Sequence, residues 1–118
     1  MPAALRAAGL EVRAHDDLFP QATEDVVWLR EAGRQRWIVI ARDNRIRYNQ
    51  LERQAVFAAR LRFFSITSPA LPADEAATLL LSALGSITRL CREHDRAGFI
   101  AKISRGPDVR ILEMGPSQ

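Results

Sequence analysis

The sequence has one cysteine, Cys91, in 118 residues, so a single chain cannot form an internal disulfide bond. An isolated cysteine fits a reducing compartment, and we expect a cytoplasmic protein. No apolar run approaches the ~18 residues of a membrane-spanning helix. The first residues also lack the continuous apolar segment of a signal peptide. We therefore expect neither a membrane partner nor a secretory leader.

Two common signatures of functional sites are missing as well. The sequence has no glycine-rich phosphate loop and no cysteine–histidine spacing of the kind that binds zinc. The two histidines, His15 and His94, have no partner at metal-binding spacing. These absences argue against a P-loop nucleotide site and against a structural zinc site.

Lysine is almost absent, because Lys102 is the only one and all other basic residues are arginines. The formal net charge is +3, but it is unevenly distributed. Nine arginines and three acidic residues fall between Arg30 and Arg62, which gives this segment +6 and the remainder −3. Such a basic surface suggests a polyanionic partner, and nucleic acid is the first candidate.

The spacing of apolar residues predicts helices that alternate with strands. We expect helices over residues 2–8, 23–32, 49–60 and 74–94, and strands over 10–14, 37–41, 62–66, 99–103 and 109–112. This order predicts an α/β fold with a mostly parallel sheet, helices on both faces and a C-terminal β-hairpin. The length fits one domain over residues 1–118.

The stretch around residues 37–47 is the most informative part of the sequence. Trp37-Ile38-Val39-Ile40 predicts a strand that is buried on both faces, and Arg42-Asp43-Asn44-Arg45 follows directly. Asp43 is thereby placed at the carboxyl end of a strand, which is the edge where open α/β sheets bind ligands. Asp16 and Asp17 follow the strand over 10–14 in the same way.

Several carboxylates are therefore expected at one edge, since Asp25 falls in the first turn of the helix after the Asp16–Pro20 loop. Such a set can hold Mg²⁺ or Mn²⁺, which prefer hard oxygen ligands. An ion of this kind activates water and stabilises a phosphoryl transition state. Arg42, Arg45 and Arg47 would bind flanking phosphates. An aspartate in a turn or at a helix start is commonly structural, so the coincidence of several is what favours a site.

Two loops of this chain resemble those of the PIN-like domains of VapC-type toxins: His15-Asp16-Asp17-Leu18-Phe19-Pro20 and Asp43-Asn44-Arg45-Ile46-Arg47. Residues 98–103 also resemble the final strand of that family, so the resemblance covers nearly the whole chain. It implies a PIN-like three-layer α/β/α fold and a metal-dependent endoribonuclease, often the toxin of a toxin–antitoxin pair. The partners it implies are RNA, an antitoxin protein and a second copy of the chain in a homodimer.

The resemblance also implies roles for single residues. Asp25 matches the acidic residue in the first turn of the helix, and Asp43 matches the acidic residue after the buried strand. Both would be catalytic and would bind the metal ion. Asp16 and Asp17 match the acidic loop and are further metal-ligand candidates. Arg42 stands where a lysine is common, which keeps the positive charge.

One feature of the family is missing from this sequence. The family opens with a strand that ends in an aspartate, ahead of the helix matched here by residues 2–8. That strand would lie between strands 10–14 and 37–41, and its aspartate would be a main metal ligand. Three explanations are open: the true start lies upstream, the two flanking strands pair with each other, or another chain supplies the strand.

Two alternative functions follow from these observations. If Met1 is the true start, we expect an N-terminally truncated domain with an impaired metal site that binds RNA or an antitoxin without cleavage. A receiver-like regulatory domain would also have an Asp-Asp pair and a later strand-end aspartate. The C-terminal hairpin and the missing lysine at a late strand edge do not fit that class.

Overall fold

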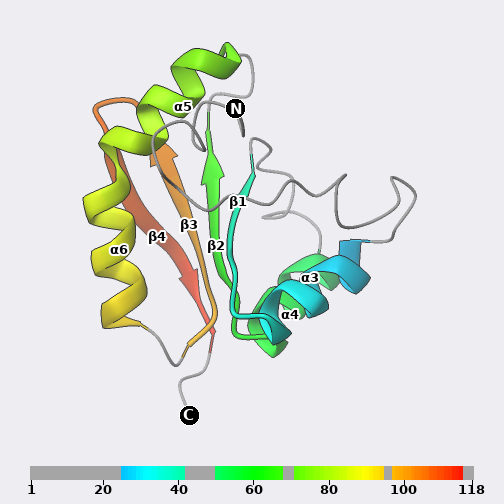
Figure 1. The fold of residues 1–118 in the computed structure, drawn as a ribbon. Coiled ribbons are helices and arrows are strands. Elements are labelled where there is room, and N and C mark those ends of the chain that lie inside the picture. The colour runs from blue at the N-terminus through cyan, green and yellow to red at the C-terminus, as the bar shows by residue number, and fades with distance from the viewer. Residues whose placement is uncertain (1–24, 42–49, 68–70, 95–96, 116–118) are drawn as a thin grey trace.

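The computed structural model describes residues 25–41, 50–67, 71–94 and 97–115. Within them the chain forms helices on both faces of a sheet with strand order β1-β2-β3-β4 (Figure 1). The neighbours β1–β2 and β2–β3 are parallel, and β3–β4 is antiparallel. The elements in chain order are α3 (Asp25–Arg34), β1 (Ile38–Ala41), α4 (Gln50–Ala58), β2 (Arg62–Ile66), α5 (Ala73–Ser82), α6 (Leu84–Glu93), β3 (Phe99–Ser104) and β4 (Asp108–Met114).

This architecture confirms the predicted α/β fold with a mostly parallel sheet and a C-terminal hairpin. Helices α3 and α4 lie on one side of the sheet, and α5 and α6 lie on the other (Figure 1). The helix and strand predicted over residues 2–8 and 10–14 fall outside the described residues. In the part of the chain that the structure describes, no helix is long and apolar enough to span a bilayer.

Two apolar cores fill the space between the sheet and its helices. Side chains alternate along a strand, so Phe63 and Phe64 of β2 enter opposite cores. Phe64 meets Phe99 edge-on under α5 and α6, with ring centroids 5.4 Å apart, and both rings are fully buried. The smaller core under α3 and α4 contains Leu29, Ala32, Val56, Leu61, Phe63 and Ile100.

Strand β1 differs from the prediction that it is buried on both faces. Ile38 is 42% exposed, and Val39, Ile40 and Ala41 are only half-buried. Among the described residues β1 pairs with β2 alone, so one side of the strand has no described neighbour. An apolar run of this kind therefore marks an outer strand of the described sheet, whereas β2 and β3 are its buried centre.

The apolar spacing of the helix over residues 49–60 predicts that Leu51, Ala55, Val56 and Ala59 face the core. This prediction is wrong at Leu51, which is 70% exposed. Val56 is fully buried, and Ala55 and Ala59 pack against the same core. Leu51 lies in the first turn of α4, ahead of Ala55, Val56 and Phe57, which form or pack against that core.

The single helix predicted over residues 74–94 is two helices. They meet at Ala83, whose N–H is shared between the carbonyl oxygens of Leu79 and Leu80 at 3.0 and 3.1 Å. Ala83 is buried and belongs to the same core as Leu80 and Ile87. The apolar stripe continues through the junction, so the spacing alone gives no sign of the break.

Helices α3 and α4 end in the same way. The N–H of Trp37 binds the carbonyl of Ala32 at 3.0 Å, and the N–H of Leu61 binds that of Val56 at 2.9 Å. These are the long hydrogen bonds of the Schellman motif, which needs a left-handed residue just before the donor. Arg36 and Arg60 are those residues, with φ of 60° and 55°. Each helix therefore turns into its strand through an arginine where glycine is usual.

A glycine directly after the predicted helix over residues 23–32 favours an end of the helix at Gly33. In the structure Gly33 instead lies inside α3, one residue before the last. A Cβ atom at Gly33 would lie 2.5 Å from the Ala59 Cβ and 2.7 Å from the Ala59 carbonyl oxygen. The missing side chain is thus what allows α3 to approach the end of α4.

Candidate functional site

The structure describes little of the predicted metal site. Asp25 is the first residue of α3, as predicted for an acid at a helix start, and its side chain is not described. Strand β1 ends at Ala41, so Asp43 follows its carboxyl end by two residues. The remaining candidates lie outside the described residues: Asp16, Asp17, Arg42, Asp43, Arg45 and Arg47.

The pairing with β2 and β3 nevertheless defines the position of the carboxyl end of β1 in the sheet. Ala41 is in register with Ser65 of β2, and Ser65 with Lys102 of β3. Ser65 and Lys102 lie two residues after Phe63 and Ile100, so they are on the same face of the sheet, the one that α3 and α4 cover. Ser65 is fully buried and Lys102 is half-buried. The sequence reasoning missed this polar row, although Lys102 is the only lysine of the chain.

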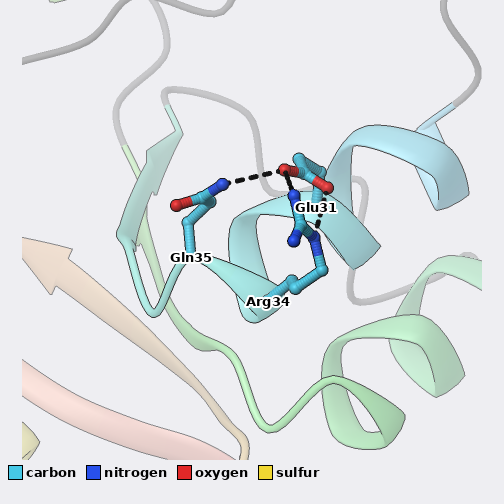
Figure 2. A network of polar contacts seen from close by, with 3 residues as sticks. All are labelled: Glu31, Arg34 and Gln35. Carbon is cyan, nitrogen blue, oxygen red and sulfur yellow. Dashed lines mark hydrogen bonds and ion pairs between the residues drawn. The ribbon is translucent and has the colours of Figure 1, made fainter.

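A polar network occupies the other end of α3 (Figure 2). The Glu31 carboxylate accepts hydrogen bonds from Arg34 Nε at 2.9 Å, Arg34 Nη2 at 2.5 Å and Gln35 Nε2 at 3.0 Å. Arg34, and then Gln35, lower the pKa of Glu31 from 4.5 to about 2. Because both oxygens of Glu31 accept these hydrogen bonds, the carboxylate holds the side chains at the end of α3 and is not a free metal ligand.

The arginines between residues 30 and 62 do not gather around one strand end. Arg34 pairs with Glu31, and Arg53 pairs with Glu113 of β4. Arg36, Arg60 and Arg62 lie at the amino ends of β1 and β2, opposite the edge that Asp43 follows. These three arginines of the basic segment over residues 30–62 therefore do not lie at the carboxyl end of β1.

These three arginines line one cavity of about 320 Å³. The register explains why they meet, since Ile38 at the start of β1 is paired with Arg62 at the start of β2. Two parallel strands that begin in register bring together the residues that precede them. The Arg62 guanidinium donates a hydrogen bond from Nη2 to the Arg36 carbonyl oxygen. This bond links the start of β2 to the connection between α3 and β1.

Metal-ligating residues do not cluster elsewhere in the described ranges. Residues 25–41, 50–67, 71–94 and 97–115 contain no group of three or more His, Cys, Asp or Glu side chains that could hold an ion. The carboxylates near β1 and α3 therefore have no competing cluster in those ranges.

The fold is a three-layer α/β/α arrangement in which two consecutive helix–strand units, α3-β1 and α4-β2, lead to parallel strands. The family model of the PIN like domain matches residues 1–68, which is more than half of the chain. The chain therefore belongs to the PIN-like domain family, and this part of the predicted resemblance is confirmed. No curated protein and no solved structure matches the chain.

Proposed function

We propose that this chain is a metal-dependent endoribonuclease of the PIN-like type and the toxin of a toxin–antitoxin pair. The observation that carries the proposal is the family match over residues 1–68, because that segment contains every predicted metal-ligand and phosphate-binding residue. We further propose that residues 1–118 form one PIN-like domain, that an antitoxin protein binds it, and that the active species is a homodimer.

The donor set fits the proposed ion. Asp16, Asp17, Asp25 and Asp43 offer carboxylate oxygens only, without a thiol or an imidazole. This chemistry suits Mg²⁺ or Mn²⁺ and does not suit zinc or copper. When bound, the ion supplies a polarised water and stabilises negative charge on the scissile phosphate.

The residues of this chain have separate tasks in the proposed reaction. Asp25 and Asp43 hold the ion from the start of α3 and from the segment after β1. The connection between α3 and β1 comprises only residues 35–37, so the start of α3 and the end of β1 both lie away from that turn. Arg42, Arg45 and Arg47 bind the phosphates on either side of the cleaved bond, because guanidinium groups match phosphate oxygens in pairs.

Cleavage of RNA by the purified chain tests this function. The chain is incubated with a structured RNA and a single-stranded RNA, each with Mn²⁺ or with EDTA, and the products are separated on a gel. We expect cleavage with Mn²⁺ only, and a loss of at least 100-fold in Asp43→Asn, since one carboxylate ligand is removed. Asp108→Asn in the β3–β4 hairpin makes the same chemical change at an exposed residue outside the matched segment.

The outcomes separate the two functions that the sequence leaves open. Cleavage that persists in EDTA or in Asp43→Asn would contradict a metal-dependent reaction at this site. RNA binding that weakens steeply with salt, without cleavage, would instead support a PIN-like domain that binds RNA and does not cut it. The toxin role predicts that expression in a bacterial host arrests growth, and that Asp43→Asn relieves the arrest.

A further inference from the structure

Strands β2 and β3 become polar toward their carboxyl ends on one face of the sheet only. On the face toward α5 and α6, Ile66 and Ile103 are fully buried and keep the core apolar to the strand ends. On the other face Ser65 and Lys102 are partners in the register, and Ser104 follows on β3. Helices α3 and α4 lie toward the amino ends of β1 and β2 (Figure 1). The carboxyl ends therefore present a polar surface on the α3 and α4 side of the sheet.

Lys102 has no ionic partner among the residues that the structure describes. The acids of the neighbouring strand β4 pair with other cations. Glu113 pairs with Arg53, and Asp108 Oδ2 lies 3.9 Å from Arg110 Nη2. Lys102 is half-buried, and a lysine of this kind packs its aliphatic stem while the ammonium group keeps contact with solvent. The ammonium group is thus available to an anion that approaches from solvent.

The strand pairing places a second cation beside Lys102, because Arg110 is its partner in the antiparallel ladder of β3 and β4. Side chains of directly opposite residues lie on the same face with Cβ atoms about 5 Å apart, and like charges there destabilise the sheet. Asp108 can offset only one of the two charges, and its ion pair with Arg110 joins two exposed groups, which makes it weak. A net positive charge therefore remains on the polar surface, and a bound anion would stabilise it.

Lys102 also lies in the same row of the sheet as the end of β1. Ala41 is in register with Ser65, and Ser65 with Lys102. Neighbouring strands are about 4.8 Å apart, so the backbone of Lys102 lies roughly 10 Å from that of Ala41. The proposed metal ligand Asp43 follows Ala41 by two residues. An RNA strand that leaves the proposed metal site along the carboxyl ends of the strands therefore passes the Lys102 side chain.

We propose that Lys102 binds a backbone phosphate of the RNA substrate, with Arg110 beside it. This inference rests on the proposed function, which brings RNA to the carboxyl ends of the strands. Arg42, Arg45 and Arg47 are assigned to the phosphates next to the cleaved bond, and Lys102 binds a phosphate further along the strand. A contact from an ammonium group to a phosphate carries no information about the base, so Lys102 contributes affinity and not sequence preference.

The single lysine of the chain makes this side chain easy to observe. Reductive methylation with carbon-13 formaldehyde labels Lys102 and the N-terminal amine, and it keeps the positive charge. The Lys102→Arg variant, which cannot carry the side-chain label, identifies the signal of the N-terminus. The labelled full chain is titrated with a single-stranded RNA in EDTA, so that the result does not depend on cleavage. We expect a saturable shift of the Lys102 methyl signal in the carbon-13 spectrum.

Affinity measurements on variants, also in EDTA, test the role of the charge. Lys102→Gln should weaken RNA binding about fivefold, and it should make the slope of log affinity against log salt shallower by about 0.7, since one phosphate contact is lost. Lys102→Arg keeps the charge and should bind within about twofold of the unchanged chain. Arg92→Gln removes one charge from an exposed residue of α6, on the other side of the sheet, and should bind equally well. The amide spectrum of each variant shows whether it remains folded.

The outcomes separate this site from the proposed function. RNA binding with an unchanged Lys102 signal and full affinity in Lys102→Gln would overturn the site and leave the ribonuclease proposal intact. A Lys102 signal that responds to RNA, in a chain that does not cleave RNA with Mn²⁺, would support the site and contradict the ribonuclease.

Three further results would overturn the role of Lys102. Equal weakening in Lys102→Gln and Arg92→Gln would reduce the effect to general charge. Equal weakening in Lys102→Gln and Lys102→Arg would indicate a loss of packing and not of charge. The absence of any RNA binding by the unchanged chain would overturn the site together with the proposed function.

Discussion

Arg36 and Arg60 adopt the same left-handed backbone conformation, with φ of 60° and 55°, at equivalent positions of two successive helix ends. The equivalence extends to the hydrogen bonds, because Trp37 and Leu61 close the same long turn one residue later. The chain thus uses one connection twice, between α3 and β1 and between α4 and β2. The same substitution at Arg36 and at Arg60 should therefore have the same effect on stability.

We expect Arg36→Gly and Arg60→Gly each to stabilise the fold. A left-handed residue other than glycine costs roughly 1–2 kcal/mol, so relief of this strain should raise the free energy of unfolding by about 1 kcal/mol. The hydrogen bond from Arg62 survives in Arg36→Gly, because its acceptor is the backbone carbonyl. Urea denaturation measures the change.

The control for these variants is Arg30→Gly, at an exposed position within α3. There glycine should lower the free energy of unfolding by about 1 kcal/mol, since the helix interior disfavours it. A loss of stability in Arg36→Gly would mean that the contacts of its side chain outweigh the strain.

Replacing glycine by alanine should have opposite effects on stability at Gly33 and at Gly85. Gly33→Ala places a Cβ atom 2.5 Å from the Ala59 Cβ and 2.7 Å from its carbonyl oxygen, so α3 and α4 must move apart. Overpacking of this kind costs about 1–3 kcal/mol. Gly85→Ala in α6 meets no atom within 4 Å and should instead stabilise by about 0.5–1 kcal/mol.

Urea denaturation of both alanine variants checks this contrast. Adding Ala59→Gly to Gly33→Ala should recover part of the lost stability, because it removes the Cβ contact but leaves the carbonyl contact. Equal free energies of unfolding for Gly33→Ala and the unchanged chain would show that the two helices do not approach as closely as described.

Glu31 should remain ionised at pH values where an ordinary glutamate is half protonated, about 4.3. Hydrogen bonds from Arg34 and Gln35 lower its pKa from 4.5 to about 2. Its stabilising effect is therefore complete above pH 4.5 and is lost as the pH falls toward about 2. Carbon-13 nuclear magnetic resonance of the side-chain carboxyl measures the titration.

Variants of the two donors should separate their effects on Glu31. Arg34→Gln should raise the pKa of Glu31 toward its ordinary value, and Gln35→Ala should raise it by less. Arg89→Gln, which removes a cation from α6, should leave this pKa unchanged. High salt should also raise it, because the exposed charge of Arg34 is screened. A pKa of Glu31 that changes neither in Arg34→Gln nor at high salt would contradict the network in Figure 2.

Cys91 should react slowly in the folded chain. It is 7% exposed, and burial raises the pKa of its thiol, which the nearby Arg62 partly counteracts. We expect iodoacetamide to alkylate it at least tenfold more slowly than in urea. Because the folded state favours the neutral thiol, its stabilising effect should fall as the pH rises above about 8.5.

The Cys91→Val variant is the control for the effect of pH. Its free energy of unfolding should change less above that pH than the free energy of the unchanged chain, because the titrating group is gone. Arg62→Gln should slow alkylation further, since it removes a nearby cation that favours the thiolate. Faster alkylation in Arg62→Gln would instead indicate that the substitution opens the core.

The centre of the sheet was predictable from local sequence. Strand β2 has the predicted bounds, Arg62–Ile66, because its aromatic and β-branched residues favour a strand. The parallel order also followed from the alternation of strands and helices. In contrast, the break at Ala83 leaves the apolar spacing intact, so periodicity could not reveal it.

Other features depend on contacts between distant residues. A glycine near a helix end suggests a stop signal, and only the proximity of Ala59 shows why Gly33 lies inside α3. The left-handed arginines are equally hidden, because the sequence gives no reason to prefer Arg36 over Gly33 for that role. The exposure of Leu51 follows from where α4 makes its contacts, which spacing alone does not specify.

The sequence showed that residues 30–62 carry a positive net charge, but it did not show where their arginines lie in the fold. Arginines that are close in the sequence are separated in the fold. Residues that precede parallel strands lie at the amino ends of those strands, and residues that follow them lie at the carboxyl ends. Arg36 and Arg60 precede their strands, whereas Arg42 follows one. The same segment therefore supplies a described basic cavity and, by proposal, a phosphate-binding loop at the opposite edge.

Strand β1 has a consequence for the order in which the fold opens. Its described hydrogen-bonding partner is β2 alone, and its side chains are half-exposed, whereas β2 and β3 form the buried centre. Amide hydrogens of β1 should therefore exchange with deuterium sooner than those of the β2–β3 pair. Such an order of exchange would mean that the strand that leads to Asp43 opens before the centre of the sheet does. Occupation of the segment beyond Ala41 by an ion or by RNA would then register as slower exchange in β1 itself.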